Sequence, residues 1–125
     1  MKPLLIALVF LSSVVTGISQ SIYAGEWMGV ITPKCVGWGR TTVWLTVFPD
    51  GYVTAGQWNF FGEELWDDFD TYISVKGSMA VVTGAGDLVT LKLTKAGKGT
   101  GTWLTPFSNA PGYCRQTVTM FREYN

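Results

Sequence analysis

The chain has 125 residues, nine basic and nine acidic side chains, and no histidine. A net charge of zero gives no electrostatic basis for binding nucleic acid or an anionic membrane. The lack of histidine excludes histidine-based nucleophilic triads and most zinc sites. Aromatic residues make up 14% of the chain and include six tryptophans, which predicts a core rich in large side chains.

The chain begins with the three parts of a secretory signal peptide. Lys2 supplies a positive charge, an almost unbroken apolar run follows, and small residues come after it. The run is too short to span a bilayer, although a retained membrane anchor is the alternative. We expect removal of residues 1–19, or cleavage after Ala24, and a single β-barrel domain over residues 20–125. The processed protein is then secreted or periplasmic and not embedded in a membrane.

Short alternating runs recur along the rest of the chain, and no long segment has the periodicity of a helix. The alternation predicts eight strands, at 25–32, 41–48, 52–58, 69–76, 79–83, 88–94, 100–105 and 114–123. Turn residues such as Pro49-Asp50-Gly51 connect most of them as tight hairpins. Eight such strands predict an antiparallel up-and-down barrel, because closure removes the exposed edges. A two-sheet β-sandwich is the alternative.

The chain contains two cysteines, Cys35 and Cys114. An even pair in an exported protein favours a disulfide over a metal or redox site. Closure of the barrel requires the first strand to pair with the last one in antiparallel fashion. Facing residue numbers then have a constant sum, which a Cys35–Cys114 bridge sets at 149.

The same sum makes specific predictions for the closing pair of strands. Apolar residues meet apolar residues: Ile31 faces Val118, and Gly29 faces Met120. Trp27 faces Arg122, which predicts an indole that plugs one barrel end with a guanidinium over its ring.

A Gly-x-Trp at the start of the first strand, here Gly25-Glu26-Trp27, combined with Arg122 late in the last strand, resembles the shared feature of calycins. These are the lipocalins, the fatty-acid-binding proteins and the avidin-like barrels. The resemblance implies an exported lipocalin-like protein that binds a small, largely apolar ligand. Small bacterial inhibitors of proteases or lysozyme are similar in size and export. An extracytoplasmic protein-interaction or enzyme-inhibitor module is therefore the alternative.

Five aromatic residues at strand ends or in loops are the candidates for binding a ligand or partner: Trp38, Trp58, Phe60, Phe61 and Trp66. Exposed aromatic side chains are common at contact surfaces, although these five could also cap the barrel ends as core. The segment 59–70 combines several of them with carboxylates. We expect this segment to be a loop and the contact surface for a protein partner.

The carboxylates of this segment crowd together instead of facing one another across a cleft. We therefore expect no enzymatic activity, with a glycosidase-like carboxylate pair as the alternative. Asp67, Asp68 and Asp70 offer oxygen ligands for calcium, but their spacing differs from the EF-hand pattern. A solvated acidic segment, with no metal and no cofactor, is the simplest interpretation.

Overall fold

The computed structural model describes residues 20–59 and 64–123, and for residues 59 and 64–68 it describes the backbone alone. The predicted signal peptide, residues 1–19, lies outside the described residues. Eight strands are present: β1 (Gly25–Pro33), β2 (Thr41–Val47), β3 (Tyr52–Asn59), β4 (Glu64–Tyr72), β5 (Ser78–Val82), β6 (Leu88–Leu93), β7 (Lys98–Pro106) and β8 (Tyr113–Arg122).

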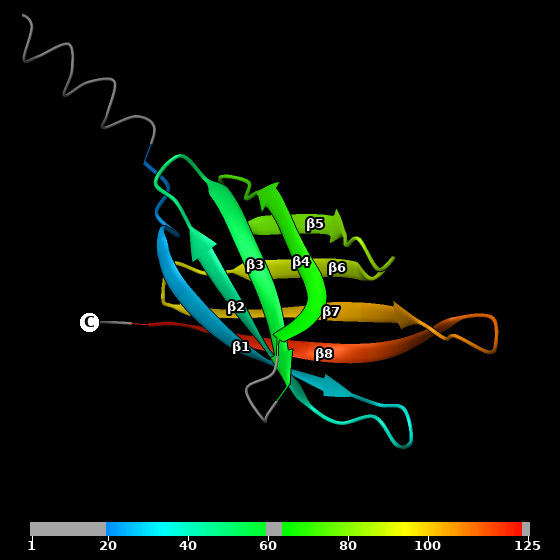
Figure 1. The fold of residues 1–125 in the computed structure, drawn as a ribbon. Coiled ribbons are helices and arrows are strands. Elements are labelled where there is room, and N and C mark those ends of the chain that lie inside the picture. The colour runs from blue at the N-terminus through cyan, green and yellow to red at the C-terminus, as the bar shows by residue number, and fades with distance from the viewer. Residues whose placement is uncertain (1–19, 60–63, 124–125) are drawn as a thin grey trace, which may run out of the picture.

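The strands form one antiparallel sheet in the order β4-β3-β2-β1-β8-β7-β6-β5. Strands that are neighbours in the sequence pair with each other, except β4 and β5, which are the two edges of the sheet, and β1 also pairs with β8, so that the sheet curls into a nearly closed barrel (Figure 1). Strands β1–β4 cross steeply over strands β5–β8 in this view. The predicted up-and-down barrel is confirmed, and the continuity of the sheet excludes the two-sheet sandwich.

Large apolar side chains fill the barrel interior, because alternate residues of each strand point inward. Trp27 and Trp103 are completely buried, and the ring centroid of Phe69 lies 5.9 Å from that of Trp103. The other large apolar side chains that are fully buried are Ile31, Leu45, Leu91, Leu93, Met120, Val43, Val53, Val89 and Val118. Residues from both halves of the barrel thus share one apolar core.

The closing pair of strands has the predicted register. Each predicted pair is present: Trp27 with Arg122, Gly29 with Met120, and Ile31 with Val118. Glycine is required at position 29, because a Cβ atom there would collide with the Sδ of Met120 and lie 2.9 Å from the carbonyl oxygen of Thr119. The backbones of β1 and β8 therefore approach without a side chain between them at this point.

Trp27 is held at the barrel end by two contacts. Its Nε1 donates a hydrogen bond to the carbonyl oxygen of Tyr23 at 2.9 Å, and the Arg122 guanidinium carbon lies 4.8 Å from the centroid of the indole. Arg122 also donates from Nη2 to the carbonyl oxygen of Ile22 at 2.8 Å. The predicted cation–π contact is present, and the same arginine fastens the segment that enters β1.

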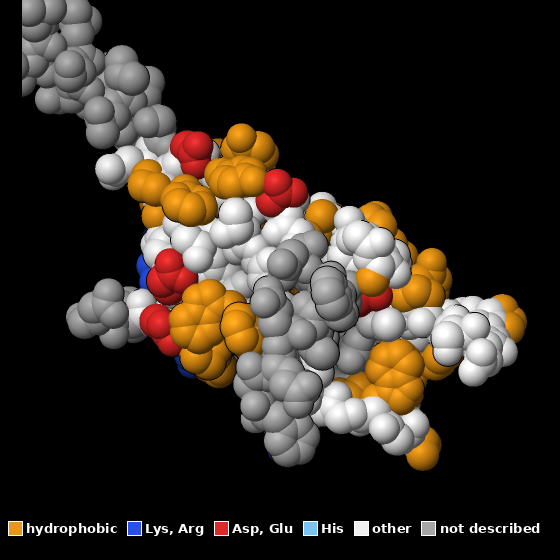
Figure 2. Space-filling model, in the orientation of Figure 1, with side chains coloured by type: hydrophobic (Ala, Val, Ile, Leu, Met, Phe, Trp, Pro, Cys, Tyr) orange, Lys and Arg blue, Asp and Glu red, His pale blue; other side chains and the backbone are white. Residues whose placement is uncertain are grey.

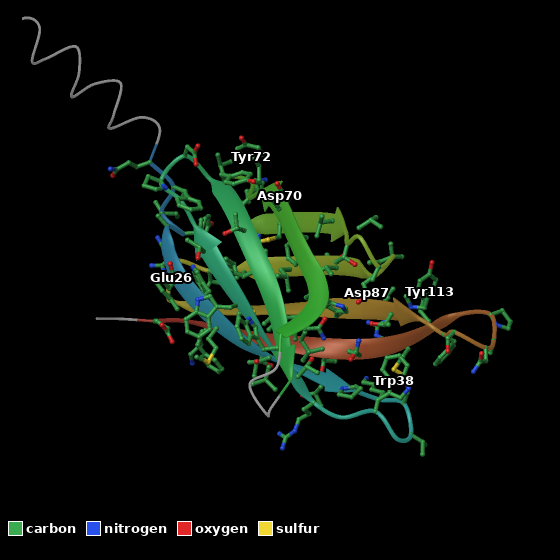
Figure 3. All side chains as sticks on the ribbon, viewed as in Figure 1. Glu26, Trp38, Asp70, Tyr72, Asp87 and Tyr113 are labelled. Atoms are coloured by element: carbon green, nitrogen blue, oxygen red, sulfur yellow. A yellow bond between two sulfur atoms is a disulfide. The ribbon has the colours of Figure 1, made fainter. Side chains whose placement is uncertain are left out.

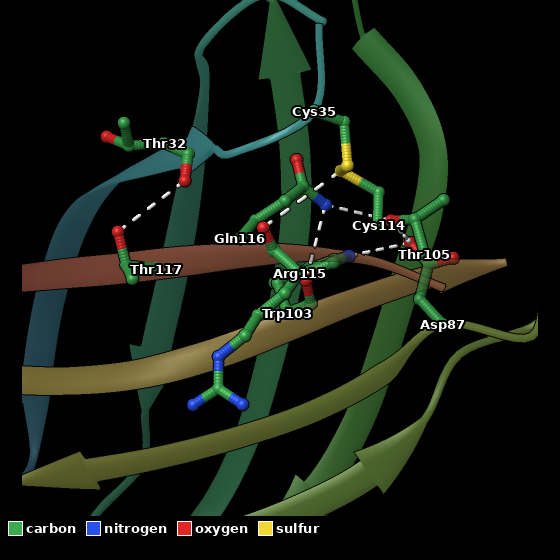
Figure 4. Close-up of a disulfide and its surroundings, with 9 residues drawn as sticks. All are labelled: Thr32, Cys35, Asp87, Trp103, Thr105, Cys114, Arg115, Gln116 and Thr117. Atoms are coloured by element: carbon green, nitrogen blue, oxygen red, sulfur yellow. Dashed lines mark hydrogen bonds between the residues drawn. A yellow bond between two sulfur atoms is a disulfide. The ribbon is translucent and has the colours of Figure 1, made fainter. Parts of the chain in front are cut away.

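The disulfide between Cys35 and Cys114 is present, with a Cα–Cα distance of 5.9 Å, beside a buried polar network (Figure 4). Within that network the Asp87 carboxylate accepts from Trp103 Nε1 at 2.6 Å and from the Thr105 hydroxyl at 3.2 Å. Gln116 donates to the same hydroxyl. The network gives the buried indole N–H a hydrogen-bond partner and pairs Oδ2 of the Asp87 carboxylate, whereas Asp87 Oδ1 is buried without a hydrogen bond from any described residue.

The fourth strand differs from its predicted position. The prediction of 69–76 is wrong at both ends, because β4 spans Glu64–Tyr72. The apolar alternation runs past the true end of the strand, and Val75 lies 91% exposed in the turn before Gly77. At the other end, the pairing with β3 shifts register over 65–69, which breaks the two-residue period on which the prediction depends. The other strands begin and end within two residues of prediction.

Replacing Cys35 and Cys114 together with alanine should lower the free energy of unfolding by about 4 kcal/mol. This is the chain-entropy estimate for a bridge between cysteines 79 residues apart. Urea denaturation of the double variant and the wild type measures the difference. A reducing agent should bring the wild type to the same midpoint and leave the variant unchanged; equal midpoints under all conditions would contradict the estimate.

Gly29→Ala should destabilise the barrel by about 1–3 kcal/mol, because the added methyl group overpacks the contact between β1 and β8. Gly39→Ala is the matched control, since a Cβ atom at Gly39 meets no heavy atom within 4 Å. Thermal and urea unfolding of both variants give the comparison. A Gly29→Ala protein as stable as the Gly39→Ala protein would show that the close approach is not required.

Candidate functional site

The two halves of the barrel carry opposite charge. Residues 20–72 contain seven acidic and two basic side chains, whereas residues 73–125 contain two acidic and six basic ones. The formal charges of these segments are −5 and +4, so the neutral total conceals a strong segregation. Strands β1–β4 contain no lysine or arginine at any position. Their outward surface is therefore acidic wherever it is charged.

An apolar row crosses the outside of the barrel on strands β8, β1 and β2. Phe121 lies opposite Met28, and Met28 lies opposite Trp44. Their side chains are 49%, 37% and 38% exposed, respectively. Trp58 on β3 is exposed to a similar degree and adds to this surface. Contiguous exposed apolar side chains in a small monomeric domain are typical of a contact surface.

A polar row lies beside the apolar row, two residues away from it on β1 and β2. It consists of four residues that face one another in neighbouring strands β1–β4: Glu26, Thr46, Thr54 and Asp70. Carboxylates stand at the two ends of the row, and two short hydroxyl side chains lie between them. The row therefore offers a low polar floor between acidic ends.

An aromatic row flanks the polar row on its other side. Phe48 stacks on Tyr52 with ring centroids 6.0 Å apart, and the ring of Tyr72 lies 5.3 Å from that of Tyr52. An open hollow of about 490 Å³ lies against this row and is lined by Phe48, Pro49, Asp50, Tyr52 and Thr54. The apolar, polar and aromatic rows, together with Trp58, are called the outer face below.

The Glu26 carboxylate is fixed by side chains of the neighbouring strand β2. It accepts a hydrogen bond from Trp44 Nε1 at 2.9 Å, and the Thr46 hydroxyl lies within 3.1 Å of both of its oxygens. Because all three residues are on the outside of the barrel, the carboxylate remains accessible at the N–H edge of the indole. A carboxylate has about four lone-pair sites, so it can accept further hydrogen bonds here.

The Asp70 carboxylate is fixed in the same manner at the other end of the polar row. The Tyr52 hydroxyl donates to Asp70 Oδ2 at 2.6 Å. This hydrogen bond is the largest cause that raises the pKa of Tyr52 above its ordinary value of 10.0, and desolvation and the negative charge of Asp70 raise it further. The phenol therefore stays protonated through neutral pH, and the contact persists there.

The outer face is visible as a mixture of apolar and acidic side chains. Figure 2 shows orange and red groups over this side of the barrel, with blue atoms only at its margin. Figure 3 places Glu26 at one end of the polar row, on β1, and Asp70 and Tyr72 at the other end, on β4.

The five aromatic residues predicted as binding residues lie in different parts of the chain. Trp38 lies in the loop after β1, near the disulfide, with its ring edge-on to Phe107 at 6.1 Å (Figure 3). Trp58 belongs to the outer face. Phe60 and Phe61 lie outside the described residues, and so does the side chain of Trp66.

The expected loop 59–70 is mostly strand, which corrects the prediction of its conformation. Residue 59 ends β3, and residues 64–70 belong to β4 because they pair with β3. Of the three residues suggested as calcium ligands, Asp67 and Asp68 have side chains outside the described part of the chain. The Asp70 carboxylate accepts a hydrogen bond from the Tyr52 hydroxyl. Among the residues whose side chains are described, no group of three acidic or cysteine residues is arranged to hold a metal.

Met28, Trp44, Phe121 and the aromatic row are not among the site residues predicted from the sequence. For Trp44 and Phe48 a signal lies in the predicted strand 41–48, where both faces of the alternation are apolar. Val43, Leu45 and Val47 fill the core, so the alternate residues Trp44 and Phe48 must face outward. Large aromatic residues on the solvent face of a barrel strand indicate a contact surface.

Asp70→Asn should lower the pKa of Tyr52 toward 10, because the carboxylate that stabilises the protonated phenol is lost. NMR titration of the tyrosine ring carbons measures the change, and Tyr52→Phe assigns the signal. Asp50→Asn is the matched control and should have a smaller effect, because Asp50 acts on the Tyr52 phenol through its charge and bonds only the backbone N–H of Tyr52. Equal shifts in the two variants would contradict the assigned role of the hydrogen bond.

No protein-family model matches the chain, and neither a curated protein nor a solved structure matches it. Within the described ranges 20–59 and 64–123, no helix is long and apolar enough to cross a membrane. The nearly closed, eight-stranded antiparallel barrel is consistent with a calycin-like fold.

Proposed function

We propose that the protein is an exported interaction module, of the kind that inhibits or recognises another protein, and that it binds a partner with a basic surface. The observation that carries this proposal is the composition of the outer face. It combines exposed aromatic and apolar side chains with carboxylates, and four of its five strands, β1–β4, contain no lysine or arginine. Aromatic anchors supply binding energy at interfaces, and complementary charge selects the partner.

A surface fits the arrangement of side chains better than an internal ligand does. Trp27 and Trp103 are completely buried and, with Phe69, occupy the interior where a lipocalin-like ligand would lie. The hollow beside Phe48 and Tyr52 opens on the outside of the barrel, where it can take a side chain of a partner. These features favour the interaction module over the binding of a small apolar ligand.

A basic protein also fits better than a neutral carbohydrate. A sugar ring stacks on an aromatic ring through its C–H face and its hydroxyls donate hydrogen bonds to carboxylates, but a neutral sugar gains nothing from a negative field. Lysine and arginine side chains use both features of the outer face, through charge-assisted hydrogen bonds and cation–π contacts.

Export, residence outside the cytoplasm and a calycin-like origin belong to the same proposal. The signal-peptide pattern supports export, and the disulfide is consistent with an oxidising compartment. The Gly25-x-Trp27 motif and the contact of Arg122 with that indole support the calycin-like origin. We propose binding without catalysis, because Glu26 and Asp70 are held as hydrogen-bond acceptors on an open surface.

Biolayer interferometry with an immobilised oligoarginine peptide tests the proposal, with oligoglutamate as the matched control probe. The wild type should bind only the cationic peptide, and binding should weaken as salt screens the charges. Trp44→Ala should weaken binding about tenfold, the loss expected for an aromatic anchor. Tyr113→Ala, which removes an exposed aromatic side chain outside the outer face, should leave it unchanged.

Three outcomes would overturn the proposal. Equal binding of both probes, or equal effects of the two variants, would remove the outer face as the site. Salt-insensitive binding of a neutral oligosaccharide, without binding of oligoarginine, would replace the basic partner with a glycan. Salt-sensitive self-association in sedimentation experiments would identify the basic half of a second copy as the occupant.

A further inference from the structure

We propose that the polar row is a trough for an extended cationic segment, which places one lysine or arginine against Glu26 and a second against Asp70. This inference rests on the proposed function and adds to it a direction, a spacing and two defined subsites. It follows from how the two carboxylates are held, how far apart the strands place them, and what flanks them.

The two ends of the polar row are built alike. At one end an indole N–H fixes the Glu26 carboxylate, and at the other a phenol O–H fixes the Asp70 carboxylate. Each donor belongs to a neighbouring strand and is itself an aromatic ring. Each subsite thus holds an oriented anion that can accept charge-assisted hydrogen bonds from a guanidinium or ammonium group.

The spacing of the subsites follows from the sheet. Glu26 and Asp70 are opposed through Thr46 and Thr54, which places them three strand steps apart. Neighbouring strands are about 4.8 Å apart, so the backbones that carry the two subsites are separated by about 14 Å along the sheet. In an extended peptide, residues four positions apart point to the same side and lie about 13–14 Å apart. Residues two positions apart reach only about half that distance.

The direction of the bound segment follows from the flanking rows. The apolar row borders the polar row on β1 and β2, and the aromatic row borders it on the other side from β2 to β4, each about 7 Å away along the strands. Between them the floor is low, because it consists of Thr46 and Thr54. A segment that runs across the strands therefore passes the apolar row at its Glu26 end and the aromatic row toward its Asp70 end, and both rows can contact the aliphatic stems of its cationic side chains.

Two peptides of identical composition test the inference. One carries two arginines separated by a single threonine, and the other carries them separated by three threonines, with the remaining threonines placed at the ends. We expect the widely spaced peptide to bind the wild type about tenfold more tightly, since it alone reaches both carboxylates. Isothermal titration calorimetry at low salt measures both affinities.

Single variants assign the two subsites. Glu26→Gln and Asp70→Asn should each reduce the affinity of the widely spaced peptide to about that of the closely spaced one. The affinity of the closely spaced peptide should change little in either variant. Asp50→Asn is the matched control, because it removes a carboxylate beside the trough but outside the polar row. This variant should lower the affinity for both peptides by the same factor.

The outcomes separate the two proposals. Equal affinities for both peptides, lowered alike by the subsite variants, would overturn the trough and leave the basic partner in place. Loss of the spacing preference in Asp50→Asn would also overturn the assigned subsites. Failure of both peptides and of oligoarginine to bind would overturn the proposed function as well.

Discussion

The contact between β1 and β8 at Gly29 is the constraint on which the rest of the molecule depends. The missing side chain lets the two backbones approach over Met120, and this pairing turns a linear meander of strands into a barrel. A shift of one residue would turn every side chain of β1 to the opposite face. The disulfide at one end and the contact of Arg122 with Trp27 at the other end hold the same register.

The register that buries the core also assembles the outer face. With Trp27 inside, Glu26 and Met28 must point outward, and pairing with β2 sets them beside Thr46 and Trp44. The hydrogen bonds that orient the Glu26 carboxylate are therefore a consequence of how the barrel closes. Stability and the candidate site cannot be separated on this strand, because one set of backbone pairings determines both.

Much of the fold could be predicted because a few residues, above all the two cysteines, determine the register of the closing strands. Two cysteines set one sum, and that sum placed Trp27 opposite Arg122 without knowledge of any coordinates. The position of β4 could not be predicted, because its register shift breaks the alternation and its carboxylates are typical of a loop. The outer face was missed because its residues come from five strands and are separated in the sequence, so only the pairings of the strands reveal the rows.

The segregation of charge has a consequence beyond the contact surface. A molecule with formal charges of −5 and +4 in its two segments has a large electric dipole moment, although its net charge is close to zero. In the field of a charged partner, such a molecule experiences a torque before any atoms touch. The torque turns the acidic half of the barrel toward a cationic surface, which raises the fraction of encounters that begin in a productive orientation. The two halves thus act together during approach, even though only one of them carries the outer face.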